Sequence, residues 1–60
     1  MNKTLLQRIA EETGCHLTPI GIARDRRLRT LYEAYMGAKN ESEKEAAYKA
    51  FVQFVREEYP

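Results

Sequence analysis

The sequence has few of the residues that form disulfides, bind metals or span membranes. Cys15 is the only cysteine, so no intrachain disulfide can form and a secreted disulfide scaffold is excluded. A zinc site needs about four ligands, and this chain offers one thiol and one imidazole, on the neighbours Cys15 and His16. No run reaches the roughly 18 apolar residues of a membrane span. We therefore expect no metal or other cofactor, no membrane insertion and a cytoplasmic location.

Glycine and proline are scarce, with three and two copies, and tryptophan is absent. Together with 32% charged and 43% hydrophobic residues, this composition is typical of an ordered helical chain. Sixty residues allow a single small domain, residues 1–60, that buries only about 60% of its unfolded surface. Neither a nucleophile with a base in reach nor a glycine-rich phosphate loop is present, so we expect no enzymatic activity.

Capping signals divide the chain into three predicted helices, at about residues 3–13, 19–36 and 41–58. A helix start needs side chains that accept from free backbone N–H groups, and a helix stop is often glycine. The signals are a Thr4–Gln7 capping box, Gly14, the Thr18–Pro19 pair, Gly37, and two overlapping boxes, Asn40–Glu43 and Ser42–Glu45. Because the connections are short, successive helices should fold back on one another. The sequence therefore predicts an all-α three-helix bundle.

Helical periodicity assigns a core face to the second and third helices. Phe51 and Phe54 are the expected core anchors of the third helix. On the second helix the apolar arc holds Ile20, Ala23, Leu28, Leu31, Ala34 and Tyr35, with Tyr32 at its edge. Its reverse face holds Ile22, Asp25, Arg26, Arg29, Thr30 and Glu33.

Arg24 and Arg27 project into the middle of this apolar arc. Their methylene stems can cover the core while the guanidinium groups reach water. Alternatively, they pair with Glu11, Glu12 or a C-terminal carboxylate, or they belong to a surface that binds a partner.

The net charge of +1 conceals an uneven distribution. Residues 1–30 carry six basic and three acidic side chains, whereas residues 31–60 carry four basic and six acidic ones. Four arginines lie within residues 24–29. We expect this region to be the binding surface of a small non-enzymatic regulatory or inhibitory protein that docks on a protein partner with an acidic groove. The candidate contact residues are Ile22, Arg24, Arg26, Arg27, Arg29 and Tyr32.

DNA binding is the alternative hypothesis. The stretch Leu6 to Ala23 resembles a helix-turn-helix, with Gly14 at the turn and Ile20 and Ala23 where the second helix would return to the core. The resemblance implies that the arginines of the second helix contact phosphates or guanine edges. A homodimer is a further alternative, since small cores gain stability by self-association. It would bury Tyr32, Met36, Tyr48 and Val52.

Overall fold

The computed structural model describes residues 3–59, and this part of the chain is helical with no strand. The expected all-α bundle is confirmed, but it has four helices where three were predicted. These are α1 (Leu5–Thr13), α2 (Pro19–Arg24), α3 (Arg26–Met36) and α4 (Glu41–Glu58). Within residues 3–59, no helix has both the length and the apolar character needed to cross a bilayer.

Side-chain caps set most helix ends where the sequence predicted them. Thr4 Oγ1 accepts from the backbone N–H of Gln7 at 3.2 Å, and Gln7 Oε1 accepts from that of Thr4 at 2.9 Å. Gly14 ends α1 with a φ of 79°, a left-handed conformation that glycine adopts at little cost. Thr18 caps α2, and Asn40 caps α4 in preference to the overlapping serine.

The predicted continuous helix over residues 19–36 is wrong, because Asp25 breaks it. Asp25 has an extended backbone (φ −99°, ψ 112°), and its Oδ1 accepts from the N–H groups of Arg27 at 2.9 Å and Leu28 at 3.2 Å. Aspartate competes in this way with the helical hydrogen bonds of the main chain. The Tyr59 hydroxyl also donates to Asp25 Oδ2 at 2.6 Å, which ties the end of α4 to this break.

The break turns α2 relative to α3 and changes which isoleucine is buried. Ile22 was expected on the polar reverse face, yet it is 5% exposed and belongs to the core. Ile20 was expected in the core, yet it is 65% exposed. Ala23 and Ala34, also assigned to the apolar arc, are exposed as well. A single 100° periodicity carried through Asp25 therefore assigned the wrong face to α2.

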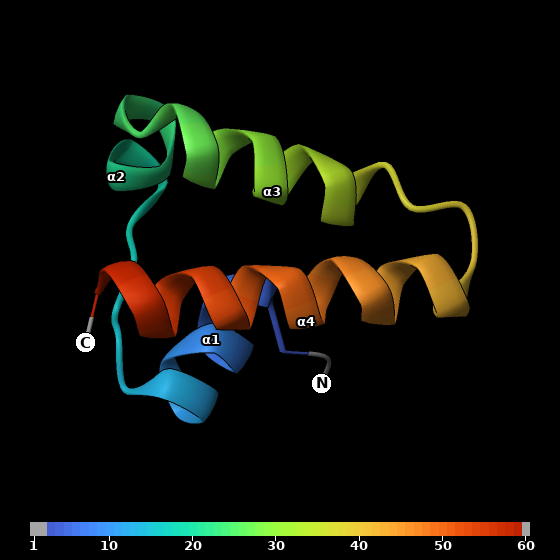
Figure 1. Ribbon diagram of the computed structural model, residues 1–60, viewed down its shortest axis with the longest axis horizontal. Coiled ribbons are helices and arrows are strands. Elements are labelled where there is room, and N and C mark those ends of the chain that lie inside the picture. The colour runs from blue at the N-terminus through green and yellow to red at the C-terminus, as the bar shows by residue number, and fades with distance from the viewer. Residues whose placement is uncertain (1–2, 60) are drawn as a thin grey trace.

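Helix α4 lies between α1 and α3 and packs against both of them (Figure 1). Phe51 and Val55 of α4 are fully buried, together with Ile9 of α1 and Leu28 of α3. Phe54, predicted as the second core anchor, is only half-buried at the edge of this cluster. The remaining buried members of the core are Leu5, Ile22, Tyr35, Tyr48 and Val52.

Candidate functional site

The six predicted contact residues do not form one surface: five of them divide between two grooves beside α3, and Arg24 is exposed and lines neither. Arg26 and Arg27 line a groove of about 470 Å³ between α3 and α4, which we call the basic groove. Its other lining residues are Thr30, Leu31, Ala50, Gln53, Phe54 and Glu57. Ile22, Arg29 and Tyr32 line a second groove of about 310 Å³, which we call the neutral groove. Its other lining residues are Leu6, Pro19, Ala23 and Glu33.

The basic groove has an apolar floor and one strongly basic wall. Half-buried Leu31 and Phe54 form part of the floor. The Arg27 guanidinium lies 5.0 Å from the centre of the Phe54 ring, within cation–π range. On the α4 wall, Glu57 Oε1 accepts from Gln53 Nε2 at 3.2 Å. The acid of this groove is therefore engaged with its own helix and forms no ion pair with the arginines opposite.

The neutral groove is built from three helices and is mainly apolar. Leu6 comes from α1, Ile22 from α2 and Tyr32 from α3, and all three are buried or half-buried. The charged side chains are Arg29 and Glu33, both exposed and one helical turn apart on α3. This groove thus carries one positive and one negative group beside an apolar floor.

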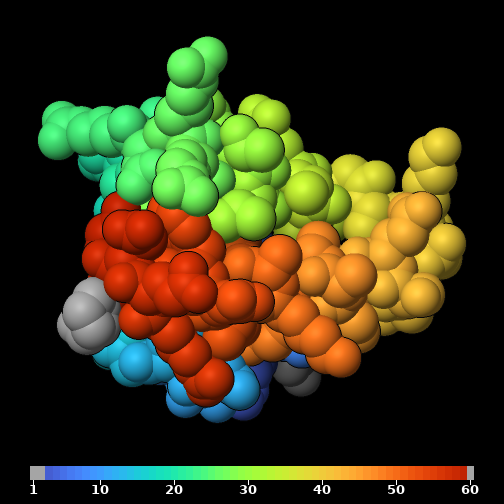
Figure 2. Space-filling model, in the orientation of Figure 1, coloured from blue at the N-terminus to red at the C-terminus, as the bar shows by residue number. Residues whose placement is uncertain are grey.

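The arginine cluster has no internal counter-ions. Within residues 3–59, none of Arg24, Arg26, Arg27 and Arg29 forms an ion pair, and all four are exposed. The alternative in which Arg24 or Arg27 pairs with a glutamate of the first helix does not occur. Those acids pair elsewhere, Glu11 with Lys3 at 2.6 Å and Glu12 with Arg56 at 3.6 Å. The α2–α3 junction projects long side chains away from the body of the molecule (Figure 2).

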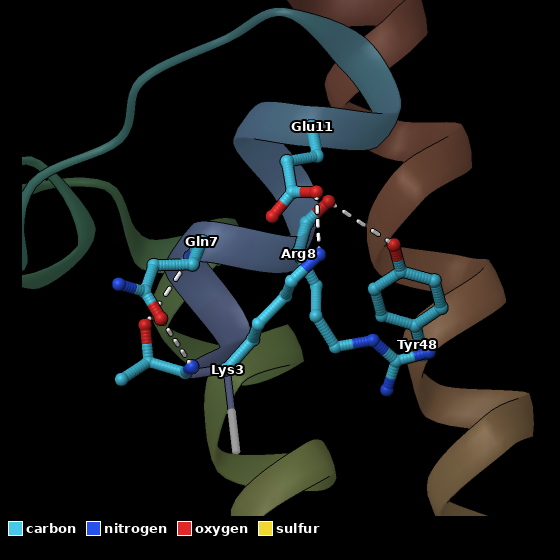
Figure 3. Close-up of polar contacts among 6 residues, drawn as sticks. Lys3, Gln7, Arg8, Glu11 and Tyr48 are labelled. Carbon is cyan, nitrogen blue, oxygen red and sulfur yellow. Dashed lines mark hydrogen bonds and ion pairs between the residues drawn. The ribbon is translucent and has the colours of Figure 1, made fainter. Parts of the chain in front are cut away.

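A third, polar pocket between α1 and α4 was not predicted from the sequence. Its centre is Arg8, whose guanidinium lies 3.9 Å from the centre of the Tyr48 ring and donates to Tyr35 Oη and Glu45 Oε1, each at 3.4 Å. The Tyr48 hydroxyl donates back to the Arg8 carbonyl at 3.3 Å (Figure 3). The hydrogen bond with Tyr35 raises the pKa of Arg8, and burial raises the pKa of Tyr48.

These contacts join residues that are 27 to 40 positions apart, so no pattern among neighbouring residues in the sequence predicts them. Because Arg8 and Tyr48 satisfy each other, the pocket is better suited to holding α1 on α4 than to binding a ligand. Tyr48 and Val52 are buried within the chain, at 9% and 8% exposure, so these two of the four residues expected in a homodimer surface do not contribute to one, and the homodimer itself stays a prediction.

The helix-turn-helix arrangement expected for residues 6–23 does not form. In the described part of the chain, α1 packs against α4 and α2 packs against α3, and α1 and α2 do not pack on each other. Ile20 and Ala23, which should return to the core in that motif, are exposed. A helix of six residues is also too short to place several side chains along a groove of DNA.

The residues with nucleophilic or metal-binding side chains form no cluster in the described part of the chain. Cys15 is half-buried against the core, whereas its neighbour His16 is exposed. Among residues 3–59, no three side chains of histidine, cysteine, aspartate or glutamate gather closely enough to hold a metal ion.

No protein-family model, curated protein or solved structure matches this chain.

Proposed function

We propose that this chain is a non-enzymatic regulatory or inhibitory protein that docks an acidic protein partner in the basic groove. The observation that carries the proposal is the pair Arg26 and Arg27, exposed and without ion pairs within residues 3–59, beside the apolar floor of Leu31 and Phe54. Arginine next to partly buried aromatic surface is the combination enriched at the energetic centres of protein interfaces. The proposal includes a cytoplasmic setting, which suits a chain with a single cysteine.

A protein partner is favoured over DNA by the shape and charge of this groove. A phosphate backbone offers acidic groups but no apolar side chains for Leu31 and Phe54 to contact. An acidic segment that carries aliphatic side chains satisfies both the arginines and the floor.

The test compares two exposed basic residues that undergo the same change of charge. Arg26→Glu alters the basic groove, and Lys49→Glu on α4 is the matched control outside it. An acid at the first position of α3 suits the helix dipole, so R26E should keep the melting temperature of the wild type. We expect affinity capture from nuclease-treated host lysate, followed by titration of the captured protein, to show binding by wild type and K49E and none by R26E.

Two outcomes would contradict the proposal. Equal capture by all three proteins would place the partner outside the basic groove. A shift of duplex DNA by the purified protein, with an affinity that falls steeply with salt and is lost in R26E, would assign the groove to nucleic acid.

A further inference from the structure

The neutral groove differs in charge and in lining from the basic groove, which is the proposed site for an acidic partner. Five of its seven lining residues are apolar, namely Leu6, Pro19, Ile22, Ala23 and Tyr32. Its charged residues, Arg29 and Glu33, cancel. An acidic protein or a nucleic acid would meet Glu33 as readily as Arg29, so the charge pattern selects neither.

The pattern is complementary to itself. Arg29 and Glu33 are four residues apart, so they lie one turn apart on the same face of α3. When two α3 helices pack antiparallel about a two-fold axis, Arg29 of each copy lies beside Glu33 of the other. Such an isologous interface uses the same patch twice and closes after two copies.

The apolar part of the surface extends beyond the groove in the same direction. Met36 follows Tyr32 by four residues and Glu33 by three, so helical spacing places it on the same side of α3. Met36 is 61% exposed, one of three large apolar side chains exposed within residues 3–59. A second α3 would cover Met36 together with Tyr32.

We propose that the neutral groove is the interface of a two-fold homodimer. The interface joins antiparallel α3 helices through reciprocal Arg29–Glu33 ion pairs over the floor of Leu6, Ile22 and Tyr32. A 60-residue chain has a small core, and burial of this surface adds to it. The basic groove shares no lining residue with the neutral groove, so the dimer proposal does not depend on the function proposed for the basic groove.

A charge-swap series tests this interface with the protein itself as probe. Wild type should sediment at twice the 7.0 kDa chain mass as concentration rises. R29E and E33R each place like charges across the axis and should raise the dimer dissociation constant at least about tenfold. The double variant R29E/E33R should restore the dimer. A one-to-one mixture of R29E with E33R should form dimers that neither variant forms alone. K49E, on α4 and outside both grooves, should dimerise as wild type does.

Three results would overturn the proposal. A wild type that stays monomeric at all concentrations would exclude self-association. A dimer unaffected by R29E and E33R, or one lost in K49E, would lie elsewhere on the chain. A monomer whose captured protein partner is lost in R29E but retained by R26E would assign the neutral groove to a different protein.

Discussion

The two grooves beside α3 show how one helix can carry two surfaces of different chemistry. Arg26 and Arg27 line the groove between α3 and α4 and make it basic, whereas Arg29 and Glu33 together line the other groove and make it neutral. Only one residue separates Arg27 from Arg29, but each step along an α-helix turns the side chain by 100°. A count of arginines along the chain therefore overstates the basic character of either surface.

The grooves also differ in what holds them in shape. The basic groove lies between α3 and α4, which pack directly on each other. The neutral groove needs α1, α2 and α3 together, although α1 and α2 do not pack on each other in the described part of the chain. The neutral groove should therefore be the more sensitive of the two to changes in the short helix α2.

The largest effect should come from Leu28, which anchors α3 and so supports both grooves. Leu28 is 1% exposed, and Leu28→Ala should lower the free energy of unfolding by about 2–5 kcal/mol. That loss is comparable to the whole stability expected for a domain of this size. Urea denaturation followed by circular dichroism measures it. Leu28→Met, which nearly conserves volume, should cost less than about 1.5 kcal/mol. A loss below that level in the alanine variant would contradict the burial of Leu28.

A smaller and more selective effect should separate the two isoleucines of α2. Ile22→Ala should cost about 2 kcal/mol or more and should damage the neutral groove first, since Ile22 forms its floor. Ile20→Ala removes an exposed side chain and should change stability by less than about 0.5 kcal/mol. Thermal unfolding of both variants provides the comparison. A larger stability loss for Ile20→Ala than for Ile22→Ala would contradict the break at Asp25 and support the continuous helix that the periodicity predicted.

The isoleucine pair shows where prediction from the sequence succeeds and where it stops. The caps at Thr4, Gly14, Thr18 and Asn40 were predictable because each depends on a residue within four positions. The break at Asp25 was missed although aspartate is a common cap. Helix-compatible residues lie on both sides of it, and its second contact comes from Tyr59, 34 residues away.

The sequence indicated which segment carries the candidate residues, but not that these residues separate into two grooves. The sequence indicated the arginine-rich segment and the residues beside it. Five of the six candidate residues line the two grooves, and Arg24 lines neither. The prediction placed Ile22 outside the core and joined both sides of α3 into one surface. The packing of α4 along one side of α3 separates them, and α4 is distant in sequence. The Arg8–Tyr48 stack was missed for the same reason.

Asp25 gives a pH-dependent test of the link between α2 and α3. The hydrogen bond from Tyr59, followed by those from the backbone of Leu28 and Arg27, holds the pKa of the Asp25 carboxyl below its usual range. Because this pKa is lower in the folded than in the unfolded chain, the carboxylate stabilises the fold at a pH above the ordinary carboxyl pKa of about 4. That stability is lost as pH falls through the lower pKa of the folded state.

Asp25→Asn should keep the cap, because asparagine accepts the same backbone N–H groups, but it removes the titration. We expect a lower melting temperature than wild type at neutral pH and a smaller further loss on acidification. Tyr59→Phe should move the Asp25 pKa up toward its ordinary value, which carboxyl NMR titration measures directly. An unchanged Asp25 pKa in Y59F would show that the 2.6 Å contact does not hold the end of α4 to the break.

The smallest effect on stability should come from Arg27, whose side chain lines the basic groove and also contacts the Phe54 ring. The guanidinium lies 5.0 Å from the Phe54 ring, and an exposed cation–π contact contributes about 0.5–1 kcal/mol. Arg27→Gln should therefore cost about that much in chemical denaturation, while Arg29→Gln should cost less in the monomer. Arg27→Lys should recover part of the loss, because lysine keeps the charge but not the planar group. Equal costs for R27Q and R29Q would mean that the Phe54 contact adds nothing, and that the two sides of α3 differ in charge alone.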